Sequence, residues 1–316
     1  FFLFTPMLHE VAASDLDITN IVSPIRKLLR RVSFFHGDIE AIDLEHHRVG
    51  VSHGHENHCH ALSYDHLVLA LGSTTNFFNI PGLADRAFTM KSLSDAIVLR
   101  NHLIANLEEA DFECGTSQRT GLLNFVVAGG GFAGVETIAA MNDFLREALR
   151  FFPHLRENML RIMLVSSGPV ILPELGEKLG TYAQRKLAEQ QIEIHSNCKV
   201  TAVKDQDVTL SDGTMITTNT LVWTAGISPH ALLNTLPCEK TKGRVLVNEY
   251  LEVPGWPGVW ALGDCAMVPD LKTGAFHPPT AQHALREGQV AAQNILATVR
   301  QGWKRPFVYS TIGLLA

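Results

Sequence analysis

A glycine-rich turn constrains the fold of this chain more than any other feature of its sequence. Residues 129–134 read GGGFAG, which places three glycines in the GxGxxG spacing. The apolar run before it, residues 122–128, is typical of a buried strand, and apolar residues recur at helical spacing after it. With a second strand predicted over residues 161–165, the turn lies in a strand–helix–strand unit, which predicts a dinucleotide site.

The glycines of this turn each have a physical role. Gly129 allows the tight bend, Gly131 lets the backbone approach a pyrophosphate, and Gly134 permits close packing of the helix on the strand. Free N–H groups and the positive end of the helix dipole would face the phosphates. We therefore expect these three glycines to bind a nicotinamide dinucleotide.

The end of the second strand indicates which dinucleotide is accepted. Residues 164–168 read LVSSG, so Ser166 stands where an acidic residue usually accepts a hydrogen bond from the ribose 2′-hydroxyl. Because no carboxylate repels a 2′-phosphate there, we expect a relaxed preference between NADH and NADPH.

Length and charge exclude several classes of protein. A chain of 316 residues is long enough for two domains. The chain has a formal net charge of −6 and so lacks the excess of basic residues that is typical of nucleic-acid-binding proteins. We therefore expect no nucleic-acid partner. No stretch approaches the roughly 18 consecutive apolar residues of a membrane span.

The cysteines indicate a reducing compartment. They are scattered without a CxxC pair, which argues against both a disulfide framework and a dithiol redox site and favours a cytoplasmic location. A lone thiol such as Cys265 is more often a packing residue than a catalytic one. The cysteines are Cys59, Cys114, Cys198, Cys238 and Cys265.

The remaining pattern indicates a domain boundary. Strand-like runs occupy residues 32–35, 39–44, 48–52 and 65–70, and a helical pattern covers residues 94–109. The loop at residues 114–121 is rich in glycine, serine and threonine, and we place a boundary there.

Two late segments carry polar groups that suit a cofactor. Asp264 follows an apolar strand and Gly263, at the strand end where α/β folds bind ligands. Further on, Thr280 and Ala281 begin a predicted helix, and Gln282 lies in its first turn. A turn aspartate and an ordinary helix cap are the alternative interpretations.

Taken in order, these motifs resemble the flavoprotein reductases with two dinucleotide folds, and most closely the type II NADH dehydrogenases. The resemblance covers essentially the whole chain. It is carried by residues 3–8 with Thr5 and Pro6, residues 64–72 ending at Gly72, residues 129–136 ending at Glu136, residues 221–229 with Gly226, residues 259–265 with Gly263 and Asp264, and residues 277–288 with Thr280, Ala281 and Gln282.

The resemblance implies an α/β protein with two Rossmann-like domains that binds FAD and NADH, with NADPH as an alternative donor. Residues 1–113 and 239–316 would form the FAD-binding domain, with residues 114–238 inserted as the nicotinamide-binding domain. Hydride would pass from the nicotinamide to FAD, and electrons would pass on to a membrane quinone without proton pumping. The family pattern assigns catalysis to Glu136, beside the nicotinamide and flavin, and to Gln282, which would meet a quinone carbonyl. Asp264 would bind the ribityl chain, and the N–H groups behind Thr280 would face the flavin.

The resemblance also implies a setting and a longer parent. The parent would be a cytoplasmic protein bound peripherally to the inner face of the plasma membrane, and a homodimer is left open. Because a first GxGxxG unit for FAD is absent, we expect about 30 further residues upstream and interpret the chain as truncated at both ends. The family continues with glutamines where this chain has Arg286 and Glu287, which bears on quinone specificity.

Two other functions remain open on the sequence alone. A soluble reductase of the same fold could donate to a ferredoxin or another protein carrier, and a non-catalytic sensor could bind the dinucleotide only. The histidine-rich segment at residues 53–60 is the densest group of metal-ligand side chains, but it lies between two strand-like runs. We expect a solvated hairpin loop there and no metal site.

Overall fold

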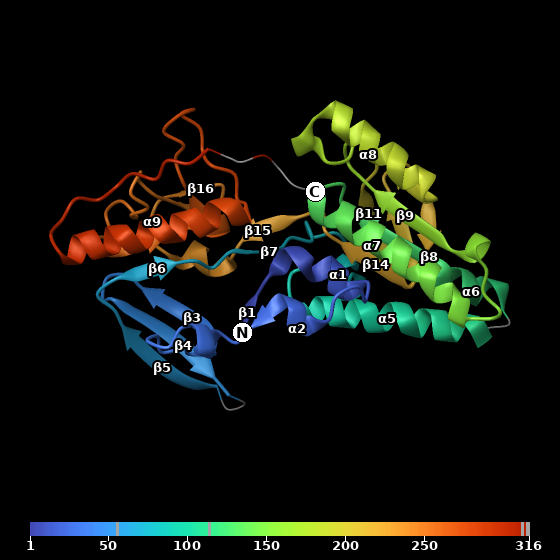
Figure 1. Ribbon diagram of the computed structural model, residues 1–316, viewed down its shortest axis with the longest axis horizontal. Helices are drawn as coiled ribbons and strands as arrows, with labels where there is room; N and C mark the ends of the chain where they lie inside the picture. Colours follow the sequence, from blue (N-terminus) through green and yellow to red (C-terminus); the bar gives the residue numbers. More distant parts are fainter. Residues whose placement is uncertain (55–56, 113–114, 311–312, 314–316) are drawn as a thin grey trace. The chain divides into compact units, whose positions relative to one another are not determined.

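The computed structural model describes residues 1–54, 57–112, 115–310 and 313, and it divides the chain into two compact units. The first unit contains Phe1–Val32 and Thr75–Gly226, and the second contains Ser33–Thr74 and Ile227–Gly313. Figure 1 shows the chain with its larger helices and many of its strands labelled. Cys114 and residues 55–56 of the histidine-rich segment lie outside the described residues.

A parallel four-stranded sheet forms the centre of the first unit. Its order is β10 (Ile192–His195), β9 (Arg161–Val165), β8 (Asn124–Ala128) and β14 (Thr220–Trp223). Every residue of β8 is buried, as expected for an apolar strand covered on both faces.

The two faces of this sheet contact different layers. Phe125 and Val127 of β8 pack in a core with α1 (Leu8–Ala12), α5 (Leu93–Phe112) and α7 (Phe132–Ala148). Val126 and Ala128 face the other way, into a core formed with the antiparallel sheet of β11 (Val200–Lys204), β12 (Asp207–Leu210) and β13 (Met215–Thr217). Successive side chains of a strand alternate between faces, so β8 contributes to both cores.

Shorter elements complete the first unit. The helices and 3-10 turns are η1 (Thr5–Met7), α2 (Ile18–Ile21), α3 (Ile25–Leu28), α4 (Leu83–Arg86), α6 (Thr116–Leu123), η2 (Leu149–Phe151), η3 (Glu157–Met159), η4 (Pro173–Leu175) and α8 (Glu177–Glu189). The strands β1 (Phe2–Leu3) and β2 (Val22–Ser23) pair in antiparallel fashion.

The second unit places one long helix beside several small sheets. The helix is α9 (Ala281–Val299), and β6 (Leu67–Leu69) pairs in parallel with β18 (Val259–Ala261). An antiparallel sheet contains β3 (Asp38–Asp43), β4 (Arg48–His53) and β5 (His58–Ser63). The remaining elements are β7 (Ser73–Thr75), β15 (Ile227–Pro229), η5 (Ala231–Thr235), β16 (Lys240–Thr241), β17 (Arg244–Leu246), η6 (Gly263–Cys265) and β19 (Ala266–Met267).

The predicted α/β architecture is confirmed, but the boundaries differ from the expected ones. The units divide at residues 74/75 and 226/227 instead of 113/114 and 238/239, and the first 32 residues join the first unit. The reason is packing. The apolar side of α5, with Leu99, Leu103 and Leu107, is fully buried in the same core as β8, and so is Val11 of α1.

Two local predictions are wrong. Residues 32–35 form no strand, and Val32 is largely exposed. The predicted loop at residues 114–121 contains most of the helix α6. No helix among the described residues has both the length and the apolar character needed to cross a lipid bilayer.

Candidate cofactor sites

The glycine turn of the first unit joins β8 to α7 as predicted. Gly129 has a φ of +135°, a conformation that L side chains rarely adopt, and its N–H donates to Val165 O at 2.9 Å. A Cβ at Gly134 would collide with Gly129 O and with the Thr224 hydroxyl. These two glycines are therefore required by the close approach of the strand, the turn and the helix.

Gly131 differs from the other two glycines because it faces open space. It is the N-cap residue of α7, and a Cβ built on it would meet nothing within 4 Å. The first turn of a helix carries N–H groups without intrahelical partners, so an anion can be bound at this end. The turn thus fits the pyrophosphate of a dinucleotide, both in its open space and in its donors.

Ser166 lies directly behind this turn, at the end of β9. The residue is buried, and a Cβ on Gly130 would collide with its hydroxyl. At the other end of β9, Arg161 makes a paired contact with Glu193, with N···O distances of 2.7 and 2.8 Å. Arg161 is therefore committed to a surface ion pair away from the turn.

Glu136 lies on α7, five residues beyond the N-cap, and is half-buried. Burial raises the pKa of its carboxyl, while the neighbouring His9 lowers it and Glu10 raises it. His9 Nδ1 lies 3.7 Å from Glu136 Oε2, and His9 Nε2 lies 3.2 Å from Glu10 Oε1. His9 is a candidate site residue that the sequence analysis missed.

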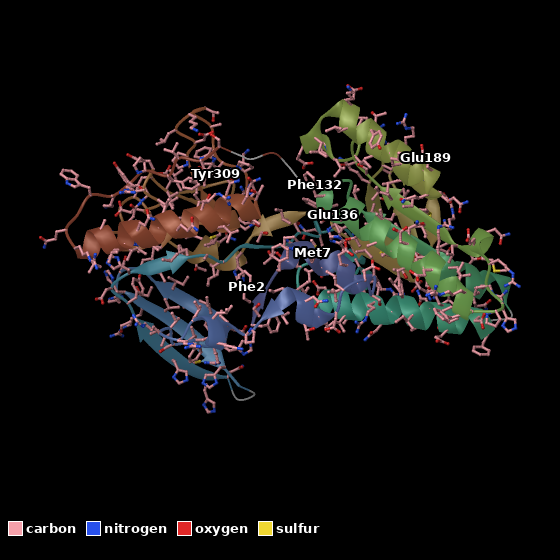
Figure 2. The ribbon with its side chains drawn as sticks, in the orientation of Figure 1. Phe2, Met7, Phe132, Glu136, Glu189 and Tyr309 are labelled. Carbon is pink, nitrogen blue, oxygen red and sulfur yellow. The ribbon has the colours of Figure 1, made fainter. Side chains whose placement is uncertain are left out.

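Thr5 and Pro6 are located in the same unit as Glu136. They form η1, which leads directly into α1 and His9, and α1 packs against α7. Figure 2 labels Met7, Phe132 and Glu136 on these neighbouring elements. The expected placement of Thr5 and Pro6 in the domain of residues 239–316 is therefore wrong, because the apolar side of α1 is buried in the core of the first unit.

Gly226 ends the first unit shortly after β14. A Cβ there would collide with the Phe78 ring and with Asn76 O, and Asn76 N donates to Gly226 O at 3.0 Å. This glycine is thus required by the close approach of two segments of the chain.

The second unit brings Gly72, Gly263 and Asp264 to the same sheet edge. Because β6 and β18 are parallel, both strands end there, and Gly72 and Gly263 follow them with φ values of +63° and +68°. Ser73 Oγ donates to Asp264 Oδ2 at 2.8 Å. Ser73 was missed, although its place after a glycine at a strand end is a signal for it. Such an edge suits hydroxyl groups of a ligand, which Asp264 can accept.

Helix α9 begins directly after Thr280 as predicted, but the Thr280 side chain makes no capping hydrogen bond, and the side chains here have partners within the unit. Thr280 Oγ1 lies 2.7 Å from His283 Nδ1. Gln282 Oε1 accepts from the Tyr309 hydroxyl at 2.9 Å, and Gln282 Nε2 donates to Gly313 O at 3.1 Å. The amide of Gln282 is therefore oriented by the chain that follows α9.

The two residues that differ from the family pattern, Arg286 and Glu287, both lie on α9. Arg286 donates to Gln282 O at 3.0 Å, and its guanidinium lies 4.7 Å from the centre of the Tyr309 ring. Glu287 is buried and accepts from Gly263 N at 2.7 Å. Burial raises the pKa of Glu287, and the Asp264 charge adds to this, whereas the Gly263 N–H lowers it.

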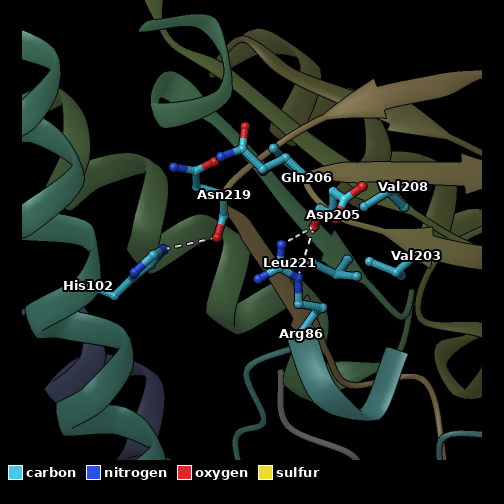
Figure 3. Close-up of a pocket in the computed structure, with 9 residues that line it drawn as sticks. Arg86, His102, Val203, Asp205, Gln206, Val208, Asn219 and Leu221 are labelled. Carbon is cyan, nitrogen blue, oxygen red and sulfur yellow. Dashed lines mark hydrogen bonds between the residues drawn. The ribbon is translucent and has the colours of Figure 1, made fainter. Parts of the chain in front are cut away.

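A cavity of about 230 Å³ in the first unit lies away from the glycine turn (Figure 3). Arg86 donates to Asp205 O through Nε at 2.9 Å, and His102 Nε2 lies 3.1 Å from Asn219 O. Asn219 directly precedes β14, whereas the glycine turn directly follows β8. Because these strands are parallel, the cavity lies at the amino ends of the strands and the glycine turn lies at their carboxyl ends. Burial lowers the pKa of His102, which favours the neutral ring.

The histidine-rich segment was expected to be a loop, but most of its described residues are in strands: His53 ends β4, and residues 58–60 begin β5, with which β4 pairs. His53 Nε2 lies 2.9 Å from His60 Nε2 with the rings nearly parallel, 7° apart. Over residues 1–54, 57–112, 115–310 and 313, no three or more histidine, cysteine or acidic side chains converge in a way that could bind a metal ion. Cys265 is fully buried, and burial raises the pKa of its thiol, which fits a packing role.

Comparison with known proteins assigns the chain to a family. Residues 1–288 match the profile of the pyridine nucleotide-disulphide oxidoreductases. The chain is 32% identical to a probable NADH dehydrogenase of Dictyostelium discoideum, over 100% of the chain and 71% of that protein. It is also 32% identical to the type II NADH:quinone oxidoreductase Ndh of Mycobacterium tuberculosis, over 99% of the chain and 70% of that protein.

Other relatives are longer, and a solved structure shares the fold. The chain is 33% identical to an external alternative NADH-ubiquinone oxidoreductase of Yarrowia lipolytica and spans 53% of its length. The structure of NDH2 from Plasmodium falciparum in complex with NADH superposes with a TM-score of 0.90 at 20% identity, covering 98% of this chain and 79% of that one. The predicted two-dinucleotide fold is thereby confirmed.

Proposed function

The chain belongs to the pyridine nucleotide-disulphide oxidoreductase family as a type II NADH dehydrogenase, and on that premise we propose that it oxidises NADH through FAD and reduces a membrane quinone without pumping protons. The observation that carries this proposal is the presence, in one chain, of two strand-end sites. One is the open glycine turn at Gly131, and the other is the Ser73–Asp264 pair.

The first unit would bind the nicotinamide dinucleotide and the second would bind FAD. N–H groups at the start of α7 would hold a pyrophosphate, and the absence of a carboxylate at residues 164–168 would admit NADPH as well as NADH. In the second unit, Asp264 would accept hydrogen bonds from ribityl hydroxyls, and the start of α9 would direct N–H groups at the electron-rich flavin edge.

When bound, the two cofactors supply the redox chemistry, with NADH as the hydride donor and the flavin as the carrier of two electrons to the quinone. The protein supplies binding, orientation and proton control. Glu136 is suited to holding a proton because burial raises the pKa of its carboxyl, and His9 limits that rise. Gln282 would donate to a quinone carbonyl from an amide that Tyr309 orients.

The lipid solubility of the acceptor supports peripheral association of the parent protein with a membrane surface. The cytoplasmic face of the plasma membrane stays our prediction for its location, and a homodimer stays open. The Yarrowia and mycobacterial relatives carry quinone oxidoreductase in their names, which supports the quinone over a ferredoxin as acceptor.

Anaerobic spectroscopy tests the proposal. We expect the purified protein to be yellow, its flavin absorbance to be bleached by NADH, and the colour to return when a soluble ubiquinone analogue is added. Reoxidation by a ferredoxin but not by the quinone analogue would favour the soluble reductase. Binding of NADH by a protein that cannot take up flavin would favour the sensor.

A further inference from the structure

Glu287 is an acidic side chain with an unusual environment in the second unit. It lies on α9, only 3% of its surface is exposed, and none of the ion pairs among the described residues includes it. An unpaired buried carboxylate is costly unless hydrogen bonds stabilise it. The contact that stabilises this one is to the backbone: Glu287 Oε2 accepts from Gly263 N at 2.7 Å.

That bond joins α9 to the turn that carries Asp264. Gly263 has a left-handed φ of +68°, and a Cβ on it would lie 3.6 Å from Ala284 Cβ, one turn before Glu287 on the same helix. The turn therefore rests directly on α9. Gly263 is partly buried and its N–H faces the buried Glu287 side chain, so the loss of this acceptor would cost free energy and loosen the turn.

The other side of the turn is fixed by β6 and its continuation. Leu262 N donates to Leu69 O at 3.1 Å, and Ser73 Oγ donates to the Asp264 carboxylate at 2.8 Å. Asp264 is thus oriented from two directions, by Ser73 at its side chain and by Glu287 through the backbone of the preceding residue.

We propose that Glu287 is a positioning residue for FAD, which holds the Gly263–Cys265 turn so that Asp264 can accept from the ribityl hydroxyls. This inference rests on the proposed function, since it takes FAD as the ligand of Asp264. The feature that positions the turn is the reach of the Glu287 side chain and its acceptor oxygen. A glutamine has the same reach and an acceptor oxygen, whereas an aspartate keeps the charge but is one methylene shorter.

Flavin titration of the deflavinated protein separates these features. We expect E287L and E287D to raise the dissociation constant of FAD at least tenfold, a change that corresponds to about 1.4 kcal/mol. E287Q should restore binding to within about threefold of the wild type, because a glutamine keeps both the reach and the acceptor oxygen that the Gly263 N–H needs. The readout is flavin fluorescence, which requires no turnover.

Asn294→Leu provides the matched control. Asn294 is as buried as Glu287 on the same helix, and its amide bonds Tyr250 O and Arg305 rather than the turn. We expect this variant to melt at a lower temperature with an FAD dissociation constant within about twofold of wild type, since its lost bonds are remote from Asp264.

Three outcomes overturn the inference: E287L and E287D bind FAD as tightly as wild type, E287Q binds as weakly as E287L, or Asn294→Leu weakens FAD as much as E287L does. The last would show that any loosening of α9 releases the cofactor. If the wild-type protein takes up no FAD, the proposed function fails. If the wild-type protein binds FAD and one of the three outcomes above is observed, only the role of Glu287 fails, so the two failures are distinguishable.

Discussion

The His9 ring lies 3.7 Å from the Glu136 carboxylate, so two residues 127 positions apart in sequence form one electrostatic pair in the first unit. Glu136 is half-buried, and the removal of water raises the pKa of its carboxyl. A positive charge on His9 acts in the opposite direction. The protonation of Glu136 is therefore set by the balance of burial and its neighbours.

Replacement of His9 by leucine should shift the pH dependence of flavin reduction. Without the ring that lowers it, the pKa of Glu136 rises further, and any step that needs the ionised carboxylate begins at a higher pH. We expect the acidic limb of the NADH-dependent flavin bleaching rate to move toward higher pH in a stopped-flow series. In E136Q that limb should be absent, and a His9→Leu limb at the wild-type position would contradict the pairing.

The same raised pKa has a consequence for stability. A carboxyl whose pKa is raised in the folded state stabilises the fold fully only below its unfolded pKa, and this contribution is lost as the pH rises through the folded pKa. E136Q should therefore make the unfolding free energy less dependent on pH in the window just above the ordinary carboxyl range. Urea unfolding at a series of pH values measures this.

Gly131→Val should separate binding from folding at the glycine turn. The structure leaves open space at Gly131, so the variant should keep its melting temperature, while the added side chain obstructs the pyrophosphate and abolishes NADH binding. Gly134→Ala is the contrasting variant, because its Cβ would collide with Gly129 O, and overpacking of this kind typically costs about 1–3 kcal/mol. Calorimetric titration with NADH and thermal melting measure the two effects; unaltered NADH binding in Gly131→Val would refute the assigned turn.

Tyr309→Phe should affect the acceptor half of the reaction alone. The hydroxyl donates to Gln282 Oε1, and its loss leaves the amide without one of the partners that orient it, at a typical cost of about 1 kcal/mol. We expect a severalfold rise in KM for a quinone analogue, with the rate of flavin reduction by NADH unchanged. A change in NADH-dependent reduction with no change in quinone KM would argue against a role for Gln282 at the acceptor.

Leu103→Ala tests the unit boundaries. Leu103 of α5 is fully buried in the core that also contains β8, and truncation of such a leucine typically costs about 2–5 kcal/mol. The matched control is Val98→Ala, because Val98 lies on the same helix and is 54% exposed, so the change should be within about 0.5 kcal/mol. Similar losses for both variants would mean that α5 does not pack as described.

Local pattern predicted the parts of the fold that depend on neighbours in sequence. The apolar run of β8, the glycine spacing and the helical pattern of α7 lie within 25 residues of one another, and all three were placed correctly. The start of α9 at Thr280 followed from the same kind of local signal.

The missed features depend on distant partners. The apolar residues of α5 predict that one side of the helix is buried, but the sequence does not show which part of the chain covers that side. In the structure it lies in the core that contains β8, so the domain boundary differs from the predicted one. Ser73 and Asp264 are 191 residues apart, and Glu287 contacts a turn 24 residues before it. Residues 32–35 have a strand-like composition without a strand to pair with, because the register of a neighbour decides whether an apolar run becomes β structure.

The central position of β8 has a further consequence. Its residues are buried between two cores, and it pairs with β9 on one side and β14 on the other. Its amide protons can reach solvent only when both neighbouring strands separate, which amounts to opening the whole first unit. Hydrogen exchange at Val126 and Val127 should therefore be the slowest in that unit and should report its global stability directly.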